Sequence, residues 1–287
     1  MPNIGYLNGQ FMPLAQMQVS VEDRGYQFGD GVYEVIRTYQ GVPFRMEEHL
    51  ERLARSAHEI KISLPLTRQE WGMAIQDGIQ RSGYKNCKVY IQVTRGAAPR
   101  EHLFAASLAP TVVMTIREMS ELDPRFYTQG VRAIMLPDIR WGRCDIKSLN
   151  LLPNVLAKQK AAEAGAFEAI FVRDRVVTEG ASSNVMIVKD RKIWTPELNE
   201  HVLPGVTLKY VMCLARENGY DVQERRIFSE ELGEADEIFL VGTTIHVLSV
   251  TQIDTISVGN GLPGPITQAL MSQFAEAVEK SSAISIN

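Results

Sequence analysis

The chain has 287 residues, of which 45% are apolar, and its formal net charge of −4 gives a sequence pI of about 5.8. This charge predicts neither nucleic acid nor a membrane surface as a partner, and the length suits one large domain or two medium ones. The N-terminus lacks the pattern of a signal peptide and no apolar run is long enough to span a membrane, so we expect a cytoplasmic protein.

The first part of the chain alternates strands with two amphipathic helices. Apolar residues recur at helical spacing in the first helix, and Gly83 ends the second. Antiparallel strands with helices on one face predict an α+β domain. The expected elements are strands around Asn8-Gly9 (4–12), strands around Gly41 (31–44), helices 46–60 and 67–83, and strands 87–96 and 110–118.

A polar, turn-rich stretch at residues 119–130 predicts the domain boundary. We expect a small α+β N-terminal domain over 1–120 and a larger C-terminal domain over 121–287. The second half is expected to hold strands 131–141, 167–196, 220–227 and 237–254, with helices 151–164, 205–219 and 265–280.

The three cysteines, Cys87, Cys144 and Cys213, are scattered along the chain and odd in number. They match neither a disulfide framework nor a zinc pattern. We therefore expect reduced thiols and no metal site.

Residues 141–150, WGRCDIKSLN, contain a lysine with two possible roles. Charged residues at 143, 145 and 147 alternate with Cys144 and Ile146, which predicts a strand that ends at Lys147. Most lysines are simply exposed. A lysine whose pKa is lowered by burial or nearby cations instead condenses with aldehydes. Arg143 would lower that pKa and Asp145 would oppose it.

Three other fragments would suit a phosphate-bearing aldehyde cofactor. Glu179 at a strand end could face a ring nitrogen, although a turn glutamate is an equally simple reading. Val206 and Thr207 follow Gly205 at a helix start, where free N–H groups favour a phosphate, and plain helix starts are common. Leu203 before them could contact a ring or be an ordinary core leucine.

A strand end at VGTTIH supplies two adjacent hydroxyls, Thr243 and Thr244. These could bind the phosphate or the substrate, or be ordinary β-branched strand residues.

Four longer motifs resemble one enzyme family over nearly the whole chain. They are EDRGYQFGDGVYEVIR, YIQVTRGAAPREH, DIRWGRCDIKSLNLL and TEGASSNV. Together they resemble the fold-type IV aminotransferases that use pyridoxal phosphate. The PREH motif resembles the D-amino-acid aminotransferase branch. The resemblance implies a two-domain fold with the cofactor between the domains and Lys147 in the C-terminal one.

The resemblance also implies roles for individual residues. Lys147 would form a Schiff base with the cofactor and move the proton during catalysis, and Glu179 would pair with the pyridine nitrogen. Leu203 would pack against the ring. The cofactor phosphate would be bound by Arg52, Val206, Thr207 and Thr243.

In the family, the substrate α-carboxylate is met by a tyrosine and by an Arg and His from the loop of the neighbouring subunit. The matching residues are Tyr33, Arg100 and His102, with Tyr90 and Thr244 in the same substrate pocket. This implies a homodimer with shared active sites. Guanidinium and carboxylate groups form strong, directional pairs.

The implied reaction is ping-pong transamination between D-amino acids such as D-alanine and 2-oxo acids such as 2-oxoglutarate. The same fold also hosts (R)-amine and branched-chain transaminases and aminodeoxychorismate-type lyases. A non-catalytic binding protein is a further alternative, against which Lys147 and Glu179 argue.

Pro153 follows Lys147 closely and limits where the next helix begins. Proline is tolerated in a first helical turn. We expect the helix to begin around residues 150–152, with Ser148 or Asn150 as its cap.

Overall fold

The computed structural model describes residues 3–105 and 107–284, and the chain divides into two compact units. The first unit comprises the chain up to Ser120, Ile146–Asn150 and the chain from Val278. The second comprises Glu121–Asp145 and Leu151–Ala277. Along the sequence, the first change of unit falls between Ser120 and Glu121. However, the short segment with Lys147 belongs to the first unit, whereas the sequence placed it in the C-terminal domain.

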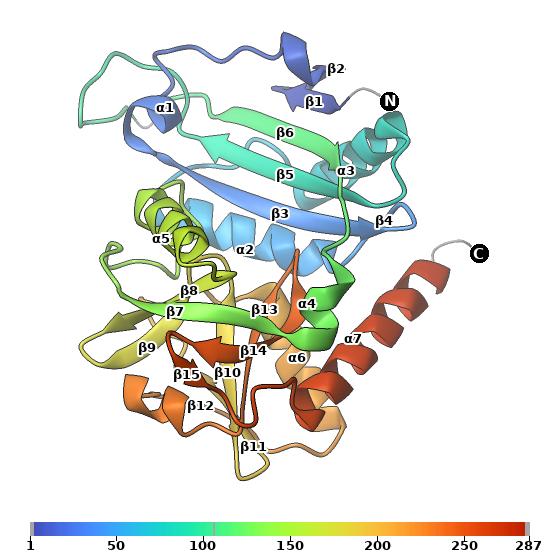
Figure 1. The fold of residues 1–287 in the computed structure, drawn as a ribbon. Helices are drawn as coiled ribbons and strands as arrows, with labels where there is room; N and C mark the ends of the chain where they lie inside the picture. The colour runs from blue at the N-terminus through green and yellow to red at the C-terminus, as the bar shows by residue number, and fades with distance from the viewer. Residues whose placement is uncertain (1–2, 106, 285–287) are drawn as a thin grey trace. The chain divides into compact units, whose positions relative to one another are not determined.

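A six-stranded antiparallel sheet forms the centre of the first unit, in the order β2-β1-β6-β5-β3-β4 (Figure 1). Asn8 and Gly9 both have positive φ, as the tight turn between the first two strands requires. The strands are β1 (Ile4–Leu7), β2 (Gln10–Pro13), β3 (Gly31–Tyr39), β4 (Val42–Pro43), β5 (Cys87–Thr94) and β6 (Thr111–Glu118).

Two long helices of this unit, α2 (Met46–Glu59) and α3 (Arg68–Ser82), pack against the sheet. Thr67 and Glu70 form a capping box at the start of α3, and Gly83 ends it with a φ of 69°. Two shorter elements are η1 (Leu14–Gln16) and α1 (Arg24–Phe28).

Strand alternation gives the sheet of the first unit two different faces. Val32 and Ile36 belong to the apolar core with residues of α2 and α3. Glu34 lies on the same face, and its side chain is fully buried although it is a carboxylate. Tyr33 lies on the opposite face, opposite Gln92 of β5. The strand therefore separates a buried carboxylate from a tyrosine.

The second unit is built on a nine-stranded mixed sheet, in the order β12-β11-β10-β13-β14-β7-β8-β9, with β15 beside β14. Parallel pairs join β7 to β14, β7 to β8, and β11 to β12. The strands are β7 (Val131–Pro137), β8 (Glu168–Arg173), β9 (Val176–Gly180), β10 (Asn184–Lys189), β11 (Lys192–Pro196), β12 (Val222–Arg225), β13 (Glu237–Gly242), β14 (His246–Ile253) and β15 (Ile256–Ser257).

The helices that begin at Leu152, Val206 and Pro265 start within one residue of where the sequence predicts them. The buried Glu237 carboxylate accepts hydrogen bonds from the N–H groups of Ile266 and Thr267 at the start of the last helix. Among the described residues, no helix is both long and apolar enough to cross a membrane. The elements are α4 (Pro124–Gln129), α5 (Leu152–Glu163), α6 (Val206–Glu217), η2 (Ser229–Gly233) and α7 (Pro265–Ile284), of which α7 belongs to the first unit from Val278 on.

The α+β class is confirmed, but three local expectations need correction. Residues 143–147 form an irregular segment with a turn at Cys144 and Asp145, not a strand, because Arg143 bonds Asp145 two residues away and Ser148 N–H bonds the Ile146 carbonyl. Helix α5 begins at Leu152, as Pro153 predicts, with Leu151 as its N-cap and no side-chain capping bond.

The expected cap, Ser148 or Asn150, was wrong. These two side chains bond each other instead, with Asn150 Nδ2 donating to the Ser148 hydroxyl at 3.3 Å. Helices α1 and α4 were not anticipated, since five and six residues are too few to show a periodicity.

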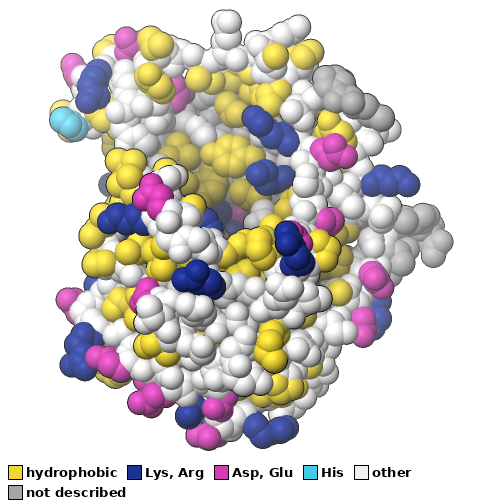
Figure 2. All heavy atoms as spheres, viewed as in Figure 1, with side chains coloured by type: hydrophobic (Ala, Val, Ile, Leu, Met, Phe, Trp, Pro, Cys, Tyr) yellow, Lys and Arg dark blue, Asp and Glu magenta, His cyan; other side chains and the backbone are white. Residues whose placement is uncertain are grey.

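On the face of the molecule in Figure 2, basic and acidic side chains occur side by side, in keeping with the small net charge.

Candidate functional site

Lys147 belongs to the first unit, and backbone hydrogen bonds hold the segment around it. The Lys147 carbonyl accepts from the Tyr33 N–H at 3.0 Å, and the Lys147 N–H donates to the Ser56 hydroxyl at 3.2 Å. Two residues on, Leu149 N–H donates to the Gly31 carbonyl at 3.0 Å. Lys147 Nζ lies 4.3 Å from the centre of the Tyr33 ring. Strand β3 and helix α2 therefore fix both the backbone and the surroundings of this amine.

Tyr33 and Tyr90 form a stacked pair beside Lys147. Their ring centroids are 5.7 Å apart and the rings are inclined by 30°. The Tyr90 hydroxyl donates to Gln92 Oε1 at 2.7 Å. Burial, and then the neighbouring Tyr33, raise the pKa of Tyr90 to about 12, so its hydroxyl remains protonated at neutral pH.

On the other face of β3, Arg52 forms a buried polar triad with Glu34 and His49. Arg52 Nε lies 2.7 Å from Glu34 Oε1 and Nη2 lies 3.0 Å from Oε2, while His49 Nδ1 donates to Oε2 at 2.7 Å. Burial alone would raise the pKa of Glu34, but the charges and hydrogen bonds of Arg52 and His49 hold it well below its usual range. Burial lowers the pKa of His49.

Sequence reasoning missed Glu34 and His49 as parts of this site. The sequence does contain a signal for Glu34. It lies between Val32 and Ile36 at two-residue spacing, so all three side chains lie on the apolar face of the strand. A carboxylate at such a position requires a buried cationic partner. His49 lies one helical turn from Arg52 on α2, and only the structure shows that it faces the same carboxylate.

Arg100 and His102 lie on the loop that follows β5, and both are exposed. The Arg100 guanidinium carbon lies 4.6 Å from the centre of the Phe28 ring, and the His102 ring centroid lies 5.7 Å from that of Phe28. The structure therefore brings these two sequence-predicted residues together over one phenyl ring.

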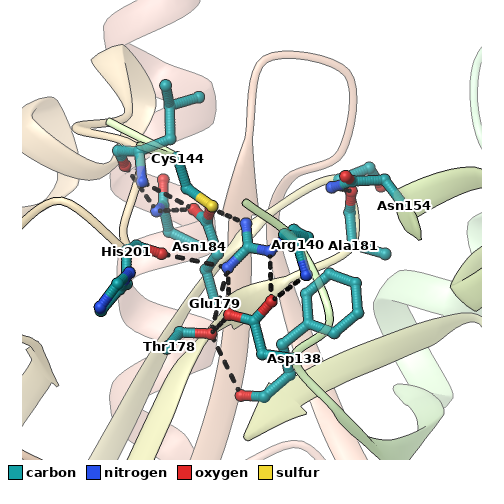
Figure 3. A network of polar contacts seen from close by, with 12 residues as sticks. Asp138, Arg140, Cys144, Asn154, Thr178, Glu179, Ala181, Asn184 and His201 are labelled. Carbon is teal, nitrogen blue, oxygen red and sulfur yellow. Dashed lines mark hydrogen bonds and ion pairs between the residues drawn. The ribbon is translucent and has the colours of Figure 1, made fainter. Parts of the chain in front are cut away.

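In the second unit, Glu179 lies buried near the end of β9 and both its oxygens are hydrogen-bonded (Figure 3). Oε1 accepts from Arg140 Nη1, and Oε2 accepts from Asn184 Nδ2 and from the Leu203 N–H, each at 3.1 Å. The carboxylate is thus fixed by a cation on one side and by two neutral donors on the other.

Arg140 is itself held by four acceptors, besides its contact with the glutamate. It donates to both Asp138 oxygens at 2.9 and 2.8 Å, to the Thr178 hydroxyl at 3.2 Å and to the His201 carbonyl at 3.0 Å. Burial would raise the pKa of Asp138, but the hydrogen bonds and charge of Arg140 lower it to about 2. Burial raises the pKa of the nearby Cys144 to about 11, so this thiol is no nucleophile at neutral pH.

The start of α6 lies against Asn184, which binds Glu179. Asn184 Nδ2 also donates to the Leu203 carbonyl at 2.9 Å. A Cβ at Gly205 would come within 2.1 Å of Asn184 Oδ1, so only glycine permits this approach. Val206 and Thr207 follow as the first residues of the helix, and both are buried.

Thr243 and Thr244 lie in the turn between β13 and β14, not inside a strand. A Cβ on the preceding Gly242 would lie 3.7 Å from the Ser182 carbonyl, in ordinary contact. This turn therefore adjoins the β9–β10 turn that follows Glu179. Within the second unit, the structure gathers the predicted residues around one corner of the sheet.

The family model described as amino-transferase class IV matches residues 31–253, which is most of the chain. The chain belongs to the class IV aminotransferase family. It is 44% identical to the D-alanine aminotransferase of Bacillus licheniformis over 276 residues, covering 96% of this chain and 97% of the relative. It is 41% identical to that of Staphylococcus haemolyticus over 277 residues, covering 96% and 98%.

The fold of this class IV aminotransferase also matches solved structures of the family. The branched-chain amino acid aminotransferase of Escherichia coli superposes with a TM-score of 0.90 at 26% identity, covering 96% of this chain and 94% of that one. The fold-type IV assignment and the aminotransferase activity expected from the motifs are confirmed.

Proposed function

We propose that the enzyme transfers the amino group of D-amino acids, D-alanine in particular, to 2-oxo acids such as 2-oxoglutarate, in two half-reactions with pyridoxal phosphate. The observation that carries this proposal is the similarity to D-alanine aminotransferases, at 44% and 41% identity over nearly the full length.

Pyridoxal phosphate needs an amine, an anion site and a carboxylate, and the chain has side chains of each kind. We assign the amine to Lys147 and the carboxylate to Glu179, which is buried and held by Arg140 and Asn184. The anion site is assigned to the N–H groups of Val206 and Thr207, with Arg52 and Thr243. The close approach that Gly205 permits supports this assignment, because it places the start of α6 beside the residue that orients Glu179.

When bound, the cofactor supplies a carbonyl that condenses with amines and a ring that takes up the electrons of a bond at Cα. Lys147 Nζ would hold the cofactor and carry the proton during each half-reaction. Glu179 would keep the ring nitrogen protonated, and Leu203 would pack against the ring. In support, the Leu203 N–H bonds the Glu179 carboxylate at 3.1 Å, which ties the two positions together.

We assign substrate recognition to the face of β3 that carries Tyr33 and to the loop after β5. Arg100 and His102, reaching in from the neighbouring subunit, would bind the substrate carboxylate, with Tyr33, Tyr90 and Thr244 around it. The high pKa of Tyr90 supports its place in this pocket, since a neutral phenol does not repel a carboxylate as a phenolate would.

A second candidate substrate class comes from the solved structures. The Escherichia coli enzyme with a TM-score of 0.90 is a branched-chain amino acid aminotransferase. Its 26% identity is well below that of the D-alanine aminotransferases, so D-amino acids remain our proposal. An (R)-amine transaminase or a lyase would share Lys147 and Glu179, and a lyase would turn over without any 2-oxo acid.

The visible spectrum of the purified enzyme tests these alternatives together. We expect a yellow absorption band that D-alanine bleaches and that neither L-alanine nor L-leucine changes. Bleaching by L-leucine alone would replace our proposal with the branched-chain reaction. Absence of the band after pyridoxal phosphate is added would overturn the cofactor assignment.

A homodimer in the cytoplasm completes the proposal. Helix α5 exposes three apolar residues on one face, Leu152, Val155 and Leu156, with exposed fractions of 68%, 60% and 50%. Such a face on a single chain marks an interaction site. All three cysteines are free thiols, which supports a reducing compartment and is tested by cell fractionation.

A further inference from the structure

Arg24, in the first turn of α1, bonds the backbone of the loop that carries Arg100 and His102. Its Nη1 donates to the Glu101 carbonyl at 2.5 Å and its Nη2 lies 3.4 Å from the His102 carbonyl. The Arg24 side chain is 4% exposed, whereas the loop residues that it contacts are exposed. A buried cation therefore reaches the peptide groups next to two exposed side chains.

A second set of contacts fixes Arg24 itself. Asp30 Oδ2 accepts from Arg24 Nε and from Arg95 Nε, both at 2.8 Å, and Asp30 Oδ1 accepts from Arg95 Nη2 at 2.9 Å. Arg95 also donates to the carbonyls of Lys61 at 2.9 Å and Ile60 at 2.6 Å. Asp30 thus joins Arg24 to the end of α2 through Arg95, and the guanidinium has little freedom to move.

Aromatic rings complete the arrangement. The Arg24 guanidinium carbon lies 4.8 Å from the centre of the Phe28 ring, and that of Arg100 lies 4.6 Å from the same ring. The His102 ring is the third group on Phe28. The centre of the Phe104 ring lies 5.8 Å from the Arg24 guanidinium carbon. Arg24 thus anchors the backbone of this loop, and Phe28 contacts the side chains of Arg100 and His102.

The start of the loop is held independently of the Arg24 side chain. The Arg24 N–H donates to the Gly96 carbonyl at 2.9 Å, and the Ala98 N–H donates to the Glu22 carbonyl at 3.0 Å. Any side chain at position 24 can keep the first of these bonds. Replacing the guanidinium would therefore release residues 101–102 without detaching the whole loop.

We infer that Arg24 is a positioning residue for carboxylate recognition: it holds the backbone at Glu101 and His102 so that Arg100 and His102 are set in place before the substrate arrives. This inference rests on the proposed function, in which Arg100 and His102 bind the substrate carboxylate. Preordering a binding loop lowers the entropic cost of binding. The effect should therefore fall on every carboxylate substrate, D-alanine and 2-oxo acid alike, and not on the cofactor.

The test compares Arg24→Met with Arg100→Ala and with the double variant. Arg24→Met should raise KM for D-alanine about tenfold, as expected for losing a hydrogen bond from a charged donor, with kcat and the cofactor band little changed. The double variant should lose less than the two single losses combined, because Arg24 acts through the loop that carries Arg100, and only its effect on His102 remains. Amide hydrogen exchange of residues 97–104, measured without substrate, should be faster in Arg24→Met than in the wild type.

Arg81→Met is the matched control. Arg81 is in the same unit, pairs with Asp77 at 2.7 Å and lies 4.9 Å from the Phe11 ring, but it does not bond the loop. It should leave both KM and exchange unchanged. If Arg24→Met does not fold, Arg24→Lys decides. It keeps the charge, but its single nitrogen cannot take the three separate positions from which Arg24 reaches Asp30 and the two carbonyls, so KM and exchange should still rise.

The outcomes separate this inference from the proposed function. If Arg100→Ala raises KM and Arg24→Met does not, the positioning role is wrong and the proposed function stands. If the two effects add in the double variant, Arg24 does not act through Arg100. If Arg100→Ala leaves KM for D-alanine unchanged, the carboxylate role of Arg100 fails and this inference falls with it.

Discussion

The Glu34 carboxylate and the Arg52 guanidinium form a buried two-point ion pair, with Arg52 Nε 2.7 Å from Oε1 and Nη2 3.0 Å from Oε2. The glutamate is fully buried and the arginine nearly so. Such a pair fixes a guanidinium in one orientation. Arg52, which we assign to the cofactor phosphate, is therefore oriented by the strand that also carries Tyr33.

Glu34→Gln should destabilise the protein and weaken cofactor binding. Removing one partner of a buried pair leaves an uncompensated charge and costs about 3 kcal/mol or more. Urea unfolding measures the first effect, and titration of the visible band with pyridoxal phosphate measures the second. Glu47→Gln is the control, because Glu47 lies 3.6 Å from Arg68 in an exposed pair. Equal destabilisation by both substitutions would contradict the structural role of Glu34.

Asp138→Asn should remove a pH-dependent part of the stability. The pKa of Asp138 is lowered from 3.8 to about 2, so its contribution is complete above pH 4 and is lost as the pH falls toward 2. A shift of this size corresponds to about 2 kcal/mol. Unfolding by urea should show that difference between wild type and variant at pH 7, and the difference should shrink as the pH falls below 4.

The control for Asp138 is Asp77→Asn, which removes the carboxylate of the exposed pair with Arg81. Exposed pairs contribute little, so this variant should follow the wild type at every pH. A constant difference between wild type and Asp138→Asn from pH 7 to pH 2 would show that packing, not charge, explains the loss.

The sequence predicted most elements of the fold because their signals are local. The Asn8-Gly9 turn, the Thr67 capping box and the C-terminal Gly83 each determine the structure within a few residues. The prediction of a strand at residues 143–147 failed for a physical reason. Alternating charges look the same whether they line a strand or, like Arg143 and Asp145, bond each other in a turn.

The sequence names candidate site residues, but it does not show the groups that hold them in place. Arg140 has no signature in the sequence, because its role depends on Asp138, Thr178 and the His201 carbonyl meeting it in space. Motifs record which side chains a family keeps near its cofactor. The hydrogen bonds that orient those side chains depend on tertiary packing.

Lys147→Ala should abolish the visible band and lower the rate roughly a thousandfold or more, since the amine has no substitute in the proposed reaction. Borohydride reduction followed by mass spectrometry of tryptic peptides should place the cofactor on Lys147 in the wild type. Lys192→Ala is the control, because Lys192 is an exposed lysine near Asp221. A yellow, fully active Lys147→Ala protein would refute the assignment.

Val155→Glu should dissociate the proposed dimer. Val155 and Leu156 are exposed on α5 by 60% and 50%, and an unpaired carboxylate in an apolar interface is costly, so the dimer should weaken roughly a hundredfold. Sedimentation equilibrium should give twice the 32.1 kDa chain mass for the wild type and a smaller mass for the variant. Met73→Glu, at an apolar position on α3 that is 56% exposed, is the control. A monomeric wild type, or a Val155→Glu protein that remains fully dimeric, would show that this face of α5 is not the interface.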